Sequence, residues 1–468
     1  MVRIFGHFVP LRVTLFVILE FFVLCWSVAL GVVLRFPHQP SPLWEISGLW
    51  WKAVVFALVW QFVFFLADLY NIDTRVGRKV LMTKTALASA GAVLLLTVCY
   101  YVIPAIYLGR GVLFLALTVA ASAAIGLRLL YFWMYSSSKY NNRVLIFGTG
   151  SAAETITDVL INGYNPGYDL IGFLDPNEEA HQSPSSSGPV EGKTYYNGED
   201  VFQVASAEGV NKIIVSPDNP DDLLPLNRFL DCKFSGIDVL SMPAAYEQLT
   251  GKILIHDLLP NWLVFADGFR TTPVSRAAKG IMDFGIGLLG LILATPFMGL
   301  IALAIKLDSR GPIFFTQERV GKNQRPFRLI KFRTMVKDAE AASGPVWAQP
   351  GDPRVTTVGR FLRRTRLDEI PQLINVLKGE MSLVGPRPER PHFVAQLQET
   401  IPFYNQRHTV KPGVTGWAQT RYPYGASEKD ALEKLQYDLY YIKNMSLFLD
   451  LLILLDTIRV VLTFRGGW

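Results

Sequence analysis

An Asp-Glu pair, Asp368 and Glu369, is the part of the sequence best suited to chemistry. It lies in the stretch FLRRTRLDEIPQLINVLKGEMSLVGPRPE, residues 361–389. The same stretch carries the arginines Arg363, Arg364, Arg366 and Arg387. Ionised carboxylates among cations suit a metal ion, a nucleophile and bound phosphate groups. The alternative is that Asp368 only caps a helix and the arginines pair with it, and the local pattern does not separate these two interpretations.

The residues after the pair have the spacing of a short amphipathic helix. The apolar positions that share one helical face are Ile370, Leu373, Ile374 and Leu377. A proline is tolerated only in the first turn of a helix, so Pro371 predicts that this helix begins at about Asp368, and Gly379 is placed to end it. Both carboxylates would then lie at a helix N-terminus, whose dipole favours their ionised form.

The composition points to a chain that is partly embedded in a membrane. Of its 468 residues, 50% are hydrophobic and only 18% are charged. The segment from Lys306 to Arg366 holds 14 Lys and Arg against 5 Asp and Glu, which attracts phosphates. No nucleic-acid recognition motif accompanies this charge, so we expect no nucleic-acid partner. The three cysteines, Cys25, Cys99 and Cys232, are too far apart for a disulfide framework or a CxxC metal site.

Four apolar segments come first in the chain, and each is long enough to span a bilayer. They lie at about 11–34, 48–69, 83–106 and 112–134. The basic loop around Arg78 and the basic flanks of the bundle place both of its ends in the cytoplasm by the positive-inside rule. Charge inside the bundle is expected to be limited to Glu20 and Asp68, near segment ends, which favours an anchor over a transporter.

A strand, a glycine turn and a helix follow from Arg143, and further strands alternate with helices to about residue 270. This pattern predicts a doubly wound, Rossmann-like α/β domain. Gly148 and Gly150 fit GxGxxA, and Asp175 stands at about the distance of a ribose-binding acid. The same glycines occur wherever a strand turns tightly into a helix, so an occupied nucleotide site is only one of two interpretations.

The last unit opens with a fifth apolar run, 281–305, which is interrupted by Pro296. Cations flank both of its ends, so a helix that enters the membrane, breaks at Pro296 and returns satisfies both flanks. The alternative is an ordinary proline-kinked span. Two short strands are expected after it, at 313–315 and 327–332, with Lys331 and Arg333 either facing a bound phosphate or forming a solvated edge. The final segment, 437–463, reads as an interfacial or core amphipathic helix pair.

From Lys279 to the C-terminus the chain resembles the bacterial polyprenyl-phosphate phosphoglycosyl transferases, the sugar transferases that initiate exopolysaccharide or O-antigen synthesis. The resemblance rests on Lys279 and Asp283 opening a membrane helix, followed by RGPIFFTQERVG, KFRTM, RTRLDEIPQLINVLKGEMSLVGPRPE and KPGVTGWAQ. One departure is Arg366-Leu367 before the acidic pair, where many relatives have Ser-Leu. The bundle and the α/β unit resemble the large form of this family.

The resemblance implies transfer of a sugar-1-phosphate from a UDP-sugar to undecaprenyl phosphate with release of UMP. Asp368 would form a covalent phosphosugar-aspartate, and Glu369 would hold Mg²⁺. Phosphate would be bound by Arg387 and Arg363, with Lys331, Arg333 and Asp438 as further candidates. It also implies a multi-pass protein of the bacterial inner membrane, with the catalytic domain on the cytoplasmic face. We expect a homodimer.

The predicted architecture is a four-segment membrane helical bundle (1–139), a Rossmann-like α/β domain (140–270) and a monotopic α+β catalytic domain (271–468) with a re-entrant helix at about 279–306. Two rival functions would account for parts of the sequence. A membrane-tethered NAD-dependent sugar-nucleotide enzyme would use Gly148–Ala153, but lacks a well-placed Tyr/Lys pair, and bound nicotinamide would reveal it. A non-enzymatic scaffold of a polysaccharide complex leaves the Asp-Glu pair and its arginines unexplained.

Overall fold

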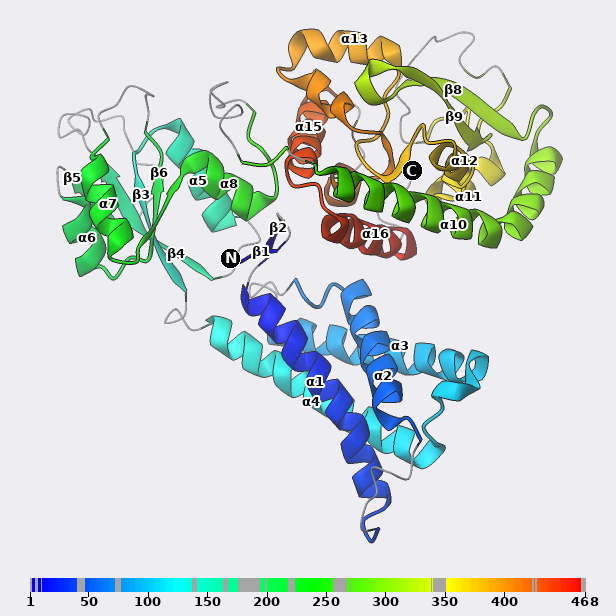
Figure 1. Ribbon diagram of the computed structural model, residues 1–468, viewed down its shortest axis with the longest axis horizontal. Coiled ribbons are helices and arrows are strands. Elements are labelled where there is room, and N and C mark those ends of the chain that lie inside the picture. The colour runs from blue at the N-terminus through cyan, green and yellow to red at the C-terminus, as the bar shows by residue number, and fades with distance from the viewer. Residues whose placement is uncertain are drawn as a thin grey trace. The chain divides into compact units, whose positions relative to one another are not determined.

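The computed structural model describes residues 2–4, 7–9, 11–39, 47–71, 77–136, 141–162, 167–175, 194–197, 200–217, 224–255, 267–269, 271–337, 339, 351–422, 425 and 427–463. The chain divides into two compact units, Val9–Thr250 and Gly251–Trp468, with the first residues shared between them. Figure 1 shows the helices and strands of both units.

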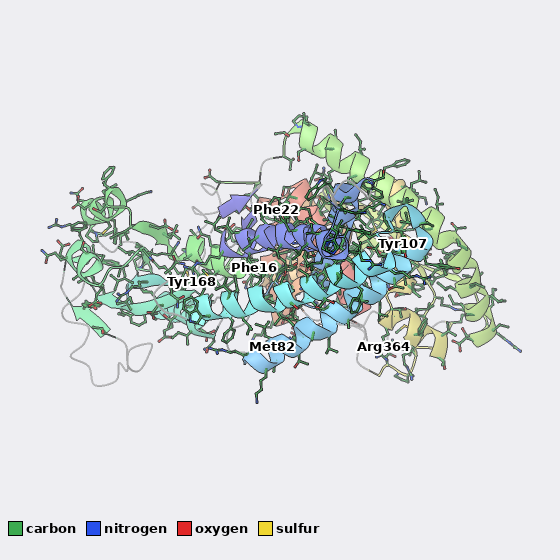
Figure 2. All side chains as sticks on the ribbon, turned by 90° about the horizontal axis from the view of Figure 1, so that it is seen from below. Phe16, Phe22, Met82, Tyr107, Tyr168 and Arg364 are labelled. Carbon is green, nitrogen blue, oxygen red and sulfur yellow. The ribbon has the colours of Figure 1, made fainter. Side chains whose placement is uncertain are left out.

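Four long helices form the first part of unit 1 and confirm the four predicted apolar segments. They are α1 (Leu11–Arg35), α2 (Leu49–Leu66), α3 (Arg78–Val102) and α4 (Arg110–Ser136). Each is long and apolar enough to cross a membrane. The ring of Phe16 is buried in the bundle, whereas Phe22 on the same helix is 55% exposed, and Figure 2 labels both. Such outward apolar side chains suit a lipid environment.

Small residues allow α1 and α4 to pack closely. A Cβ on Gly31 would lie 2.9 Å from the backbone nitrogen of Ala116, so only glycine fits there. Ala116, Ala120 and Ala124 repeat at every fourth position of α4 and are buried. This spacing of small residues is typical of helices that pack in membranes.

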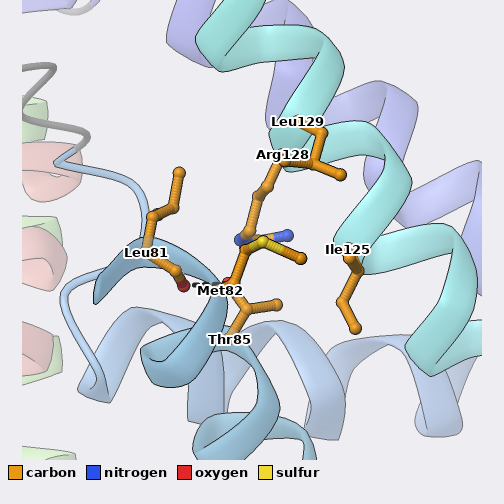
Figure 3. A pocket seen from close by; sticks show the side chains of 6 residues that line it. All are labelled: Leu81, Met82, Thr85, Ile125, Arg128 and Leu129. Atoms are coloured by element: carbon orange, nitrogen blue, oxygen red, sulfur yellow. Dashed lines mark hydrogen bonds between the residues drawn. The ribbon is translucent and has the colours of Figure 1, made fainter. Parts of the chain in front are cut away.

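A buried ion pair between Arg128 of α4 and Glu20 of α1 crosses the bundle. The Tyr70 hydroxyl donates to Glu20 (2.6 Å), and the Arg128 guanidinium lies 4.2 Å from the centre of the Phe64 ring. Figure 3 shows Arg128 reaching from α4 toward α3. The expectation that bundle charge is limited to Glu20 and Asp68 was therefore wrong, because it omitted Arg128. Pairing offsets much of the cost of burying either charge alone.

A five-stranded parallel sheet forms the second part of unit 1. Its strands are β3 (Asn142–Phe147), β4 (Tyr168–Asp175), β5 (Thr194–Asn197), β6 (Lys212–Val215) and β7 (Asp238–Ser241), in the order β5-β4-β3-β6-β7. The helices that alternate with them are α5 (Ser151–Asn162), α6 (Val201–Ala207), α7 (Leu226–Phe234) and α8 (Met242–Thr250). This α/β alternation is the predicted one, and the strand order is compatible with a doubly wound sheet.

Gly148 has a structural reason to be glycine. Its φ is 112°, and a Cβ there would lie 1.9 Å from the carbonyl oxygen of Ser216, at the end of the neighbouring strand. Close approach of two backbones therefore accounts for this residue without a ligand. Gly150 directly precedes α5, and the side chain of Asp175 lies outside the described part of the chain.

Unit 2 begins before the predicted boundary at residue 271. Ile253 and Ile255 are buried in its core, and the Trp417 indole donates to the carbonyl of Gly251 (2.9 Å). The helices of this unit are α10 (Pro273–Asp308), α11 (Thr357–Arg364), α12 (Gln372–Leu377), α13 (Pro391–Thr400), α14 (Trp417–Arg421), α15 (Glu428–Lys443) and α16 (Leu447–Leu462). The expected C-terminal pair of helices corresponds to α15 and α16, with much of α15 buried in the core.

Two small sheets lie within residues 251–468 of unit 2. An antiparallel pair, β8 (Phe314–Val320) and β9 (Pro326–Phe332), corresponds to the two expected strands and is longer than predicted. A parallel pair, β10 (Ser382–Val384) and β11 (Gly413–Thr415), was not predicted. Three residues are too few for the alternation that identifies a strand in sequence.

The apolar helix α10 continues through Pro296, so the predicted interruption was wrong. Figure 1 shows that the helix changes direction along its length instead. A proline removes one helical hydrogen bond without forcing the chain out of the helix, which produces a kink. Ile301 and Ile305 in the second half pack with Phe332 and Leu362. The middle of the helix remains apolar and outward, with Phe297 61% exposed.

Candidate functional site

A tight turn, not the expected helix start, carries the acidic pair. Residues Leu367–Glu369 form one 3-10 turn, and α12 begins only at Gln372, after Pro371. Arg366 adopts a left-handed conformation (φ 60°), which turns the chain from α11 into this segment. Gly379, with φ 78°, ends α12 as predicted.

Glu369 is held by cations from three segments. Its Oε1 accepts hydrogen bonds from Lys331 Nζ (3.1 Å) and Arg387 Nη2 (2.9 Å), and Arg366 Nη1 lies at 3.8 Å. The residue is only 8% exposed, and burial alone would raise its pKa. The charges of Arg387, Lys331 and Arg366 outweigh burial, so the pKa of Glu369 lies below its usual range.

Asp368 has a different environment, although it is the next residue. It is 7% exposed and accepts no hydrogen bond from any residue that the structure describes. Burial raises the pKa of Asp368, and the charge of Lys331 opposes this shift. For Asp368, burial therefore opposes the predicted effect of a helix dipole, which was expected to favour the ionised form of both carboxylates. The two neighbours therefore differ: Glu369 is fixed in place, whereas no described residue donates a hydrogen bond to the carboxylate of Asp368.

Three of the predicted phosphate-binding residues lie around this pair. Lys331 projects from β9 onto Glu369, and burial lowers its pKa while Glu369 raises it. Arg387 spans Glu369 and Gln419, donating to Gln419 Oε1 at 2.8 Å. Arg363 donates from Nε to Thr334 Oγ1 (2.8 Å), and its charge lowers the pKa of Asp368. The structure therefore brings Lys331, Arg363 and Arg387 together with the acidic pair.

The other two predicted phosphate-binding residues, Arg333 and Asp438, form hydrogen bonds to other protein groups. Arg333 donates to the carbonyl oxygens of Ser309 (2.8 Å) and Arg310 (3.1 Å), just beyond the end of α10. Asp438 pairs with Arg407 (2.8 Å), and burial raises the pKa of Asp438 to about 6 against the opposing charge of Arg407.

Arg407 was absent from the predicted residues, but it supports the site. Its Nη2 donates to the main-chain carbonyl of Arg387 (2.9 Å) as well as to Asp438. Asp438 thus reaches the site through Arg407 and the backbone of Arg387. No local sequence signal marks this role, because the partners are 20 and 31 residues away from Arg407.

The two polar residues at the start of α10 attach this helix to β10. Lys279 donates to Asp450 (2.8 Å) and to the carbonyl of Val384 (3.2 Å). Asp283 accepts from the Ser382 hydroxyl (2.7 Å) and the Leu383 N–H (3.2 Å). Because β10 leads directly to Arg387, these contacts join α10 to the site.

The oxygen atoms of Glu369 suit a hard cation that also binds phosphate groups. No group of three or more His, Cys, Asp or Glu among the described residues is arranged to hold a metal alone. Glu369 uses Oε1 for its cations, and no described residue donates to Oε2. Mg²⁺ is commonly bound by one or two carboxylates together with substrate phosphates, so Glu369 fits this mode.

Comparison with known proteins agrees with the motif resemblance. A family described as bacterial sugar transferase matches residues 274–464. An Aeromonas hydrophila protein named UDP-N-acetylgalactosamine-undecaprenyl-phosphate N-acetylgalactosaminephosphotransferase is 44% identical over 256 residues, which make up 54% of this chain and 60% of that protein. The match thus spans less than two thirds of this relative.

Two further relatives are covered more completely. A Caulobacter vibrioides protein named UDP-glucose:undecaprenyl-phosphate glucose-1-phosphate transferase is 43% identical over 202 residues, 42% of this chain and 75% of that protein. A Rhizobium leguminosarum protein named exopolysaccharide production protein PSS is 42% identical over 195 residues, 41% of this chain and 98% of that protein.

Proposed function

Because this chain belongs to the bacterial sugar transferase family, we propose that it transfers a sugar-1-phosphate from a UDP-sugar to undecaprenyl phosphate and releases UMP. The observation that carries the proposal is the unequal environment of the acidic pair. Glu369 is fixed by Lys331 and Arg387, whereas Asp368 is buried beside it and accepts no hydrogen bond from the described residues.

In the proposed first step an oxygen of Asp368 attacks the phosphorus next to the sugar. A bond forms between this oxygen and phosphorus, the bond to the UMP oxygen breaks, and UMP leaves. The product is a phosphosugar-aspartate. In the second step an oxygen of undecaprenyl phosphate attacks the same phosphorus and releases Asp368 unchanged. Lys331, Arg387 and Arg363, which lie around the acidic pair, would offset the charge of an incoming diphosphate.

We further propose that Glu369 holds Mg²⁺ through its Oε2, with substrate phosphates as the other ligands. The bound ion would supply charge neutralisation on the diphosphate, which lowers the repulsion that an anionic nucleophile meets. The contribution of the chain is to keep Glu369 ionised and oriented, which Lys331 and Arg387 do through Oε1.

We also propose that α10 enters the inner membrane, kinks at Pro296 and returns to the cytoplasmic face. Both halves of the helix contact the catalytic unit, through Asp283 near its start and Ile305 near its end. A helix that spans the bilayer would place one of these contacts on the far side of the membrane. Re-entry would place the acidic pair at headgroup level, where a lipid phosphate meets a soluble nucleotide.

Cysteine labelling tests this topology. We expect Val274→Cys and Leu307→Cys, which replace side chains 77% and 80% exposed at the two ends of α10, to react with a membrane-impermeant maleimide only after the cells are permeabilised. The background protein lacks Cys25, Cys99 and Cys232, and His38→Cys in the loop after α1 is the control expected to react in intact cells. Labelling of one α10 flank in intact cells would establish a spanning helix instead.

A UMP-release screen with undecaprenyl phosphate tests the proposed reaction. Two relatives are named for different sugars, N-acetylgalactosamine and glucose, so UDP-N-acetylgalactosamine and UDP-glucose are the first donors to compare. We expect repeated turnover with at least one UDP-sugar when lipid phosphate and Mg²⁺ are both present. Without lipid phosphate, UMP release should stop after one equivalent per protein. A screen without release from any UDP-sugar would overturn the proposal. The name of the Rhizobium relative supports a place in exopolysaccharide production.

A further inference from the structure

Asn375 is completely buried in α12 and bonds to two other segments of the site. Its Oδ1 accepts a hydrogen bond from the Ile330 N–H (3.1 Å). Its Nδ2 donates to the carbonyl of Arg328 (2.8 Å) and to Glu380 Oε2 (2.7 Å). Its own carbonyl accepts from the N–H groups of Glu380 (3.1 Å) and Met381 (3.3 Å). One side chain thus joins α12 to β9 and to the segment that enters β10.

The side chain of Asn375 forms hydrogen bonds with β9 of the kind that a neighbouring strand would form. Among the described residues β9 pairs only with β8, so its other edge has no strand partner. The carboxamide of Asn375 accepts from the N–H of Ile330 and donates to the carbonyl of Arg328 on that edge, as a peptide group of a neighbouring strand would. This fixes the backbone immediately before Lys331.

The position of β9 matters because Lys331 has a long, flexible side chain. Its Nζ lies 3.1 Å from Glu369 Oε1, and its charge opposes the effect of burial on Asp368. Both carboxylates lie in the turn that leads into α12, whereas Lys331 lies on β9. The bonds of Asn375 are therefore a direct polar link between the segment with the carboxylates and the strand with the lysine.

We propose that Asn375 is a positioning residue for Lys331. Its side-chain amide holds β9 against α12 in the arrangement that places Nζ on Glu369. The expected effect on UMP release rests on the proposed transferase function. The expected effect on the reactivity of the Lys331 amine does not rest on that function. Removing the amide leaves the Ile330 N–H and the Arg328 carbonyl unpaired and frees β9 to shift.

A double-mutant cycle tests the kinetic consequence. We expect Asn375→Ala to lower kcat/KM for UMP release by about 10²-fold, because a displacement of about 1 Å has effects of this size. In a Lys331→Met background the same substitution is expected to have little further effect, because the lysine that it positions is gone. An equal loss in both backgrounds would overturn the inference. Asn375→Ser, which keeps a small polar side chain at this position, repeats the cycle if the alanine variant does not fold.

Labelling of Lys331 tests the structural consequence without turnover. We expect a small amine-reactive reagent, with modification quantified by mass spectrometry, to modify Lys331 faster in Asn375→Ala than in the wild type. The matched control is Asn444→Ala, which removes another buried asparagine of unit 2, whose Nδ2 donates to the Tyr440 carbonyl (3.2 Å), and is expected to leave Lys331 protected. Unchanged labelling would overturn the inference, whereas absence of UMP release from the wild type would overturn only the proposed function.

Discussion

Replacement of Asp368 by asparagine is expected to abolish transfer, lowering kcat by about 10³-fold or more, while the protein still folds. The amide has nearly the shape of the carboxylate but is a poor nucleophile. The substitution breaks no hydrogen bond with the described residues. Because burial raises the pKa of Asp368, ionisation destabilises the folded state at neutral pH, so a neutral side chain is expected to keep or increase the unfolding temperature.

UMP release and thermal unfolding, measured on the same preparations, check this expectation. The control is Asp430→Asn, in the capping box of α15, where Asp430 accepts from Ser427 and Tyr422. This control is expected to cost about 1 kcal/mol of stability and to keep full turnover. Robust turnover by Asp368→Asn would exclude Asp368 as the nucleophile.

Glu369→Gln is expected to impair both activity and stability. The substitution removes the negative charge that faces Lys331, Arg387 and Arg366 and leaves these cations close together. Loss of one partner from a buried charge group costs about 3–5 kcal/mol, so we expect a lower unfolding temperature. We also expect kcat/KM to fall by about 10²-fold or more, because the arginine and lysine lose their positions and the proposed Mg²⁺ ligand loses its charge.

The contrast with Asp368→Asn makes this prediction specific. Both substitutions replace a carboxylate by an amide, and the two residues are adjacent. Asp368→Asn is nevertheless expected to preserve stability and Glu369→Gln to reduce it. Glu369→Asp keeps the charge on a shorter side chain and is expected to recover part of the stability. A Glu369→Gln protein that unfolds at the wild-type temperature would contradict the assigned pairing of Glu369 with the three cations.

The sequence was informative wherever a feature is local or repeats at a regular spacing. The four apolar segments, the alternation of the α/β unit and the end of α12 at Gly379 are all visible from neighbouring residues. The acidic pair and its cations Lys331 and Arg387 were found by residue type and motif, and the structure brings them together. The exact start of α12 was missed because Pro371 follows a 3-10 turn that propensity does not distinguish from a helix.

Features that depend on distant partners could not be predicted. Arg128 and Glu20 are 108 residues apart, and each is a single charge within an apolar run. Arg333 and Asp438 are chemically suited to phosphate, but their partners lie on other elements. Asn375 has no sequence signature, because its importance comes from an edge of β9 that has no strand partner among the described residues and that exists only in the folded chain.

Intact-protein mass spectrometry after incubation with a UDP-sugar and Mg²⁺, without lipid phosphate, tests the central claim most directly. The proposed mechanism predicts a mass increase of one sugar-phosphate, located on the peptide that contains Asp368 and absent from Asp368→Asn. Addition of undecaprenyl phosphate should remove it. If UMP release requires the lipid phosphate from the first turnover and no adduct forms, transfer is a single direct displacement and Asp368 is not the nucleophile.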